Sequence, residues 1–298
     1  MKKYDDNFSS YHPLINFIYF FSVIVFSMFL MHPILVFISL TGGFIYSVYL
    51  KGRKAVKCNT FYMLPIVLIL AVINPLVSHE GNTVIFYING NAVTVEAFIY
   101  GMISAVMFIS VLIWFTSYNV IMTSDKFTYL FGKIIPSTSL IITMILRFVP
   151  RFKRQIKIVA EGQRAIGRSV KDGNIFDRIN HGINIISILT TWVLENSIET
   201  ADSMKARGYG LKERSNFNYY KLTKRDFKIL ASILVLIAVI IIGLINGQGE
   251  IIFYPDIKIR KIDPFSIVFY ISYLILMLIP FIVDVMEELK WKLLKYKI

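Results

Sequence analysis

The stretch that decides the fold is AFIYGMISAVMFISVLIWFTS, residues 97–117, which contains no Asp, Glu, Lys or Arg. About 20 apolar residues cross the hydrocarbon core of a bilayer as a helix, and roughly 17 are the lower limit. This run is therefore predicted to span a membrane. The chain of 298 residues is 56% hydrophobic, contains 24 Phe and 17 Tyr, and has a mean hydropathy of +0.62. This composition is typical of an integral membrane protein with aromatic side chains at the membrane interfaces.

Five further runs approach the spanning length, and they lie at 14–31, 34–50, 61–77, 227–246 and 265–284. The first two are short and are separated by His32-Pro33, so one of them is a candidate for a tilted or re-entrant helix. The sequence therefore predicts an all-α polytopic membrane protein with about six membrane helices.

Charge in the loops predicts the orientation of these helices. The loop at 51–59 carries only basic charges, whereas the loop at 78–96 carries two Glu and no Lys or Arg. Lys and Arg are enriched in cytoplasmic loops. The first loop is therefore predicted to be cytoplasmic and the second external, which also places both termini inside. The chain divides into membrane helices over 1–117, a cytoplasmic domain over 118–226, and a membrane hairpin with a basic tail over 227–298.

The cytoplasmic insert carries 18 Lys and Arg against 9 Asp and Glu. It is too long for a connector and too apolar for a disordered segment. Residues 137–150 are predicted to form a buried helix that Pro150 ends or kinks. Residues 151–168 are predicted to form an amphipathic helix with a basic polar side, which faces either solvent or anionic lipid.

A third helix is predicted from Ile175 to about Ala206, with Asn174 as its N-cap. Its length is on the order of 48 Å at 1.5 Å per residue. Glu195, Glu199 and Asp202 fall on one face. Because no His joins them at ligand spacing, we expect this row to pair with the basic helix before it rather than to bind a metal.

The end of this helix lies in ADSMKARGYGLKER, residues 201–214. Lys205 and Arg207 place positive charge in its last turn, where it complements the helix dipole. Gly208 is predicted to adopt the left-handed conformation that ends a helix. Capping accounts for Lys205 and Gly208, but it does not require an exposed Arg207 beside Tyr209. This pair is typical of a hot spot for another protein.

These residues resemble the transmembrane T component of energy-coupling factor (ECF) transporters, in which long cytoplasmic coupling helices end in motifs with a central Arg. Ala206-Arg207-Gly208 matches such a motif directly. The first motif is best matched by Gly167-Arg168-Ser169, and another register places Ile166 at the central position with Arg164 and Arg168 on either side. Segments 74–87 and 122–155 also resemble the family, so the resemblance covers most of residues 60–226.

The resemblance implies that these six motif residues dock on two ABC-type ATPase subunits, with Arg164, Lys205 and Tyr209 in support. It further implies a separate substrate-binding membrane S component, uptake of vitamins or trace metals, and the plasma membrane of a prokaryote. In this interpretation the chain transmits ATP-driven motion, is not itself an enzyme, and needs no cofactor and no metal.

Other readings of the residues remain open. The chain lacks the G-x-x-x-x-G-K-[ST] loop of ATP hydrolysis, and its one cysteine, Cys58, excludes a disulfide framework. The net charge of +13 is better explained by anionic lipid than by nucleic acid. The alternatives are a membrane enzyme that acts on lipid or prenyl substrates, and a scaffold whose basic helices lie on anionic lipid. Alternation in 254–264 predicts a short external hairpin.

Overall fold

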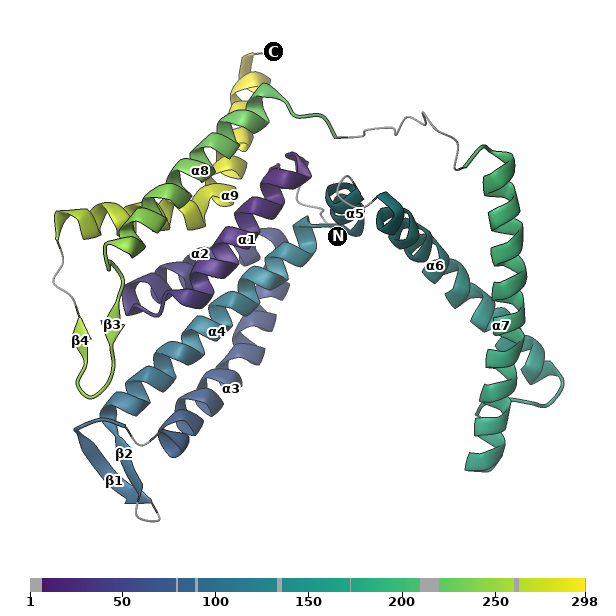
Figure 1. Cartoon of the computed structure of the whole chain (residues 1–298), viewed down its shortest axis with the longest axis horizontal. Helices are drawn as coiled ribbons and strands as arrows, with labels where there is room; N and C mark the ends of the chain where they lie inside the picture. Colours follow the sequence, from purple (N-terminus) through teal and green to yellow (C-terminus); the bar gives the residue numbers. More distant parts are fainter. Residues whose placement is uncertain are drawn as a thin grey trace. The chain divides into compact units, whose positions relative to one another are not determined.

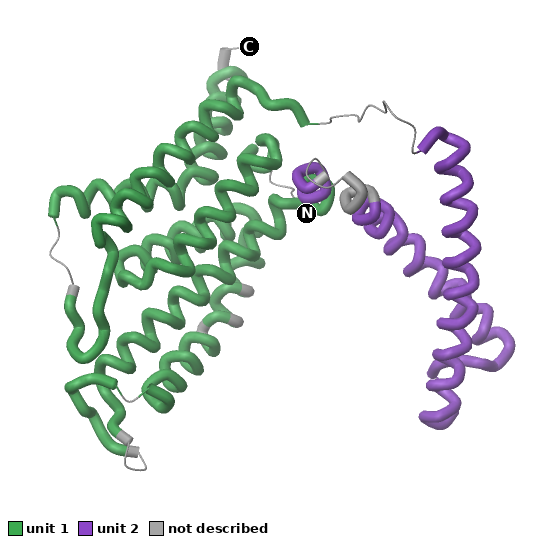
Figure 2. The backbone as a smooth tube through the Cα atoms, in the orientation of Figure 1, with its two compact units in different colours: residues 1–126, 220–298 green, residues 127–219 purple. Residues whose placement is uncertain are grey.

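The chain folds into two compact units in the computed structural model (Figure 2). Unit 1 comprises residues 1–126 and 220–298, and unit 2 comprises residues 127–219. The structure describes residues 7–78, 80–88, 91–132, 136–171, 173–209, 220–259 and 263–297.

Unit 1 is a bundle of six long helices (Figure 1). They are α1 (Pro13–Phe29), α2 (Pro33–Lys51), α3 (Arg53–Val77), α4 (Val95–Ile121), α8 (Lys224–Ile245) and α9 (Pro264–Lys297). Five of them are long and apolar enough to cross a membrane, whereas α1 is apolar but has only 17 residues. Each of the six predicted runs matches one of these helices, although the runs 14–31 and 227–246 extend two residues and one residue past the ends of α1 and α8. This agreement confirms the predicted all-α polytopic fold.

The centre of unit 1 is an aromatic cluster around Trp114 of α4, which is fully buried. Its indole N–H donates to the carbonyl oxygen and to the hydroxyl of Ser39, each at 3.2 Å. The Ser39 hydroxyl is 2.6 Å from the hydroxyls of Ser27 and Ser110, so three helices share one chain of hydrogen bonds. The rings around the indole belong to Tyr19, Phe20 and Tyr46.

Close packing of α8 on α9 depends on Gly243, because a Cβ at this position would overlap the ring of Phe269. We expect Gly243→Ala to lower the stability of unit 1 by about 1–3 kcal/mol, as overpacking typically does. Thermal denaturation of the detergent-solubilised protein measures this loss. Gly162→Ala is the matched control, because Gly162 lies within helix α6 (Pro136–Ala165) and has nothing within 4 Å of an added Cβ. Equal melting curves for the two variants would contradict the predicted clash.

Two short antiparallel hairpins lie at one end of unit 1. β1 (Val84–Ile88) pairs with β2 (Asn91–Thr94) between α3 and α4, and β3 (Ile251–Ile252) pairs with β4 (Lys258–Ile259) between α8 and α9. The Asn82 side-chain amide donates to the Asp256 carboxylate at 2.9 Å, which joins the two hairpin regions. Of the hairpin predicted in 254–264, only β4 lies in that segment, because its partner β3 precedes it; residues 260–262 lie outside the described residues. The other hairpin was not predicted.

The other end of unit 1 is tied together by a short 3-10 helix, η1 (Phe8–Ser10). The Phe8 backbone N–H donates at 3.0 Å to the carboxylate of Asp284, which lies in α9 and is fully buried. Lys126 donates to the carbonyl oxygens of Ser9 at 2.6 Å and Ile121 at 3.0 Å. Because Lys126 is the last residue before unit 2, this cluster holds the point from which unit 2 departs.

The return from unit 2 is held at the same end. Arg225, at the start of α8, forms an ion pair of 3.0 Å with Glu287 of α9 and lies 4.1 Å from the ring centroid of Tyr11. The Tyr11 hydroxyl donates to Glu287 at 3.3 Å. Burial raises the pKa of Tyr11 to about 12, so this hydroxyl stays a neutral donor at physiological pH.

Unit 2 consists mainly of α6 and α7 (Ile175–Ala206), which follow the short helix α5 (Ser124–Gly132). The segments predicted as two helices, 137–150 and 151–168, form the single helix α6, which continues through Pro150 to Ala165. Of the two predicted effects of Pro150, a break and a kink, the break was wrong, because a proline removes one backbone donor without ending a helix whose other turns are hydrogen-bonded and packed. Ile141, Ile145 and Val149 are also not buried as expected but 44–54% exposed.

Candidate docking ends of the helical hairpin

The helices α6 and α7 form an antiparallel hairpin joined by the loop 166–174. The buried residues of α7 are Ile185, Leu189 and Asn196. Arg151 of α6 donates to the side-chain oxygen of Asn196 at 2.7 Å, and its guanidinium lies 5.3 Å from the ring centroid of Trp192. One long basic side chain thus fixes how the two helices face each other.

The bounds of α7 agree with those predicted from the sequence. Its first turn is held by a capping box, in which the Asn174 and Asp177 side chains each accept from the other residue's backbone N–H. At its end, the Gly208 N–H donates to Lys205 O at 2.9 Å and the Tyr209 N–H donates to Met204 O at 3.0 Å. Gly208 has φ +76°, as the predicted left-handed cap requires. This arrangement is a Schellman motif.

The end of α6 has the same turn. The Gly167 N–H donates to Arg164 O at 3.0 Å, the Arg168 N–H donates to Gln163 O at 2.9 Å, and Gly167 has φ +77°. The backbone of Ala165-Ile166-Gly167 is therefore equivalent to that of Ala206-Arg207-Gly208. Ile166 occupies the position of Arg207.

The matching turns set Ile166, rather than Arg168, opposite Arg207 when the ends of α6 and α7 are compared. Arg168, which the sequence favoured as the counterpart of Arg207, is instead the counterpart of Tyr209. Ile166 is 63% exposed at the first end, and Arg164 and Arg168 beside it are exposed as well. Any part that these residues play in docking stays a prediction.

Ser169 differs from the other predicted site residues because it is buried. Its hydroxyl accepts from the Lys171 N–H at 3.1 Å, and the carbonyl oxygen of the next residue, Val170, accepts from Arg178 Nε at 2.9 Å. These bonds brace the loop after α6, so Ser169 shapes this end rather than offering a surface.

The two turns lie at opposite ends of the hairpin. The α6 turn adjoins the start of α7, whereas the α7 turn lies beside Met144 and Arg147 in the first half of α6. With 32 residues in α7, the two ends are on the order of 48 Å apart. The exposed residues Lys205, Ala206, Arg207 and Tyr209 gather at one end, and Arg164, Ile166, Gly167 and Arg168 gather at the other.

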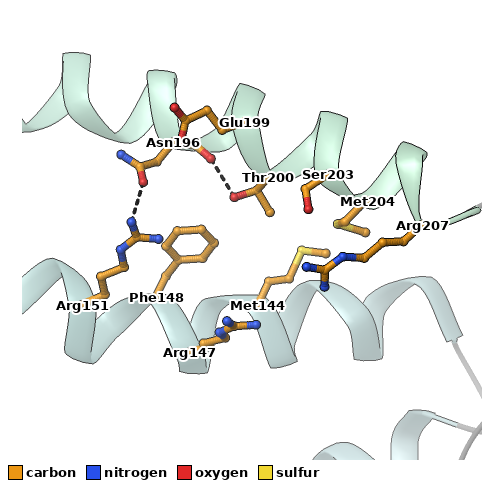
Figure 3. A pocket seen from close by; sticks show the side chains of 10 residues that line it. All are labelled: Met144, Arg147, Phe148, Arg151, Asn196, Glu199, Thr200, Ser203, Met204 and Arg207. Carbon is orange, nitrogen blue, oxygen red and sulfur yellow. Dashed lines mark hydrogen bonds between the residues drawn. The ribbon is translucent and has the colours of Figure 1, made fainter.

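A cleft of about 360 Å³ opens between α6 and α7 at the Arg207 end (Figure 3). Its apolar lining comes from Met144, Phe148 and Met204. Its charged lining comes from three basic residues, Arg147, Arg151 and Arg207, and from one acidic residue, Glu199. Arg147 was not among the predicted site residues. It lies four residues before Arg151 and seven before Arg154, and hence on the same face of the helix as both.

The acidic row of α7 does not pair with α6 as predicted. Glu195, Glu199 and Asp202 are exposed, and within the described residues none of them has a Lys or Arg nitrogen within 4 Å. The reason is that Trp192 and Asn196 face Arg151, which leaves the acidic side chains beside the contact. Across the part of the chain that the structure describes, no group of three His, Cys, Asp or Glu could hold a metal ion.

The left-handed turn at Gly208 gives a direct test of the α7 end. An L-residue in this conformation costs roughly 1–2 kcal/mol, so Gly208→Ala is expected to loosen the last turn of α7. Hydrogen exchange of the amides in residues 204–209 should then accelerate by about tenfold, which corresponds to 1.4 kcal/mol. Gly182→Ala within α7 is the control, since nothing lies within 4 Å of an added Cβ there. Unchanged exchange in Gly208→Ala would contradict the assigned cap.

Two curated proteins are similar to part of this chain. The energy-coupling factor transporter transmembrane protein EcfT of Lacticaseibacillus paracasei is 29% identical over 105 residues, which are 35% of this chain and 40% of the relative. The protein of the same name from Lactobacillus helveticus is 29% identical over 105 residues, or 38% of its length. The match thus covers about two fifths of these relatives, and no protein-family model matches the chain. Over this segment, the chain is related to the transmembrane components of energy-coupling factor transporters.

Proposed function

We propose that this chain is the coupling subunit of an energy-coupling factor importer, and that its α6–α7 hairpin binds two ATPase subunits, one at each end. The observation that carries the proposal is that the α6–α7 hairpin has a Schellman turn at each of its two ends. The residues around each turn are exposed. A pair of ATPase subunits offers two grooves, which a hairpin with two separated ends can engage together. The similarity to the two EcfT proteins supports this assignment.

The mechanism follows from the stiffness of the hairpin. ATP binding draws the two ATPase subunits together, and helix ends held in their grooves move with them. Because α6 and α7 are continuous helices that contact each other, they transmit this motion as levers. The motion reaches the membrane helices where unit 2 joins unit 1, at Lys126 and before Arg225.

The proposal also assigns partners and orientation. Residues 1–117 and 227–298 lie in the plasma membrane of a prokaryote, with both termini inside, and residues 118–226 are cytoplasmic. A separate membrane subunit binds the substrate, a vitamin or a trace metal. The hairpin end of unit 1 is external, which agrees with the lack of Lys and Arg between α3 and α4.

An exposed apolar face of α7 supports a contact with membrane or with a membrane subunit. Phe176, Ile179, Ile183 and Ile186 recur at steps of three and four residues and are 53–77% exposed. The same face favours a second candidate function, a scaffold that lies on anionic lipid without an ATPase. The experiment below separates the two.

The test is co-purification. The tagged chain is co-expressed with the ATPases and substrate-binding membrane proteins of its own genome, solubilised and isolated. The proposal expects ATPase subunits and a membrane subunit in the isolated complex. If the chain retains no ATPase but binds vesicles of anionic lipid by itself, the scaffold function stands and the coupling function is refuted.

A further inference from the structure

Two arginines in the cleft between α6 and α7 form no ion pair with any described residue, although Glu199 also lines the cleft. Arg151 is engaged with Asn196 and Trp192. Arg147 and Arg207 line the same space, and among the described residues no carboxylate oxygen lies within 4 Å of either guanidinium. In Figure 3 both side chains reach toward Met144 from opposite helices.

Because three arginines and only one glutamate line the cleft, its net charge is positive. Arg147 and Arg207 therefore repel each other, and an anion bound between them would remove the electrostatic cost of that repulsion. The planar guanidinium is suited to a carboxylate, since it offers parallel N–H donors. Met144, Phe148 and Met204 supply an apolar lining beside the charges. This combination suits a side chain with an aliphatic stem and a carboxylate head, namely Asp or Glu.

We infer that Arg147 and Arg207 hold one acidic side chain of the partner protein between them, so that Arg147 is half of the docking site at this end. The inference rests on the proposed function, because the partner is the ATPase subunit that meets the end of α7. Arg207 is the C-cap of α7 and Tyr209 follows on the exposed turn, so an occupant of the cleft also contacts that turn.

A shared carboxylate has a consequence for the lever. A contact with Arg207 alone would move only the end of α7. A carboxylate bound by both arginines clamps α6 to α7 where the helices are otherwise separated by the cleft. The motion of the ATPase then enters both helices at once.

The experiment measures the affinity of the purified ATPase subunits for the full chain in detergent. The variants are Arg147→Gln, Arg207→Gln and the double variant, and Arg154→Gln is the matched control, because Arg154 is exposed on the same face of α6 but outside the cleft. Each single change in the cleft is expected to weaken binding at least tenfold, whereas the control changes it less than twofold. The double variant is expected to bind about as weakly as the weaker single variant, because both arginines hold the same group.

A second readout does not depend on charge. A photo-crosslinking amino acid at Met144 is expected to capture an ATPase subunit, and the same group at Lys153, which is outside the cleft, is not. Far-UV circular dichroism and gel filtration check that every variant is folded, as the exposure of Arg147 leads us to expect.

The possible outcomes separate the two levels of the argument. If Arg207→Gln loses the ATPase while Arg147→Gln behaves like the control, the shared site is overturned and the coupling function stands. If Arg147→Gln weakens binding to phosphatidylglycerol vesicles but not to ATPase, the anion is a lipid phosphate and the inference is again overturned. A wild-type chain that binds no ATPase overturns the proposed function and this inference with it.

Discussion

Replacing Arg207 by glutamate is expected to release the ATPase subunit for which we propose a docking site at the end of α7. The substitution removes a guanidinium from the C-cap and places a carboxylate beside the acid that Arg207 would hold. Breaking a buried contact of this kind costs about 2–5 kcal/mol, and every 1.4 kcal/mol is tenfold in affinity. The dissociation constant should therefore rise roughly 30-fold or more.

Arg154→Glu makes the same change of charge on α6, away from the α7 turn, and serves as the control. It is expected to leave ATPase binding within about twofold of wild type, because an exposed charge contributes little by itself. Binding is followed by co-purification and by titration of the ATPase onto the immobilised chain. If both variants lose the ATPase to the same extent, the helices present a diffuse basic surface and Arg207 is no specific anchor.

Trp114→Ala is expected to cause the largest loss of stability among substitutions in unit 1. The indole is fully buried, contacts three aromatic rings and donates to Ser39. Removing a buried Trp typically costs about 3–5 kcal/mol, because a cavity remains where the ring packed. The change also removes the donor that anchors the hydroxyl chain of Ser27, Ser39 and Ser110.

The control for this substitution is Trp291→Ala, in the last part of α9, where the indole is 62% exposed. Melting of the detergent-solubilised protein, followed by intrinsic fluorescence or by circular dichroism, should show a drop of several degrees for Trp114→Ala and little change for Trp291→Ala. A Trp114→Ala protein that melts with wild type would show that the aromatic cluster does not hold the bundle together.

The helices of the bundle could be predicted because each spanning run is long and free of charge. The bounds of α7 could also be predicted, since Asn174 and Gly208 mark its ends through local hydrogen bonds that the sequence specifies. The continuity of α6 could not, because the effect of Pro150 depends on packing along the whole helix. Asn89-Gly90, a common hairpin turn pair, follows the apolar run Val84–Ile88 directly and was the available signal for the unpredicted hairpin β1–β2.

Prediction of the docking ends was limited in a different way. Gly208 was recognised because charge and an aromatic side chain surround it. The favoured motif Gly167-Arg168-Ser169 lies two residues after Ala165-Ile166-Gly167, the segment whose backbone turn matches that of Ala206-Arg207-Gly208. The segment 164–168 offers both alignments, and only the backbone hydrogen bonds distinguish the turns. Arg147 was not assigned, because the helix face that it shares with Arg151 and Arg154 does not show which part of α6 lies beside the end of α7.

Buried polar groups that join distant parts of the chain could not be predicted either, because their partners lie far away in the sequence. Asp284 lies near the predicted internal tail, yet it is fully buried and accepts from the backbone of Phe8, 276 residues away. No local pattern contains such a partner.

The central claim is that one chain binds two ATPase subunits through the two ends of its α6–α7 hairpin. Native mass spectrometry of the purified complex tests it most directly, with wild type compared with a variant that carries Ile166→Glu and Arg207→Glu. The account predicts two ATPase subunits for each wild-type chain and none for the variant. A wild-type complex with a single ATPase subunit or with none, or a variant that still carries two, would contradict it.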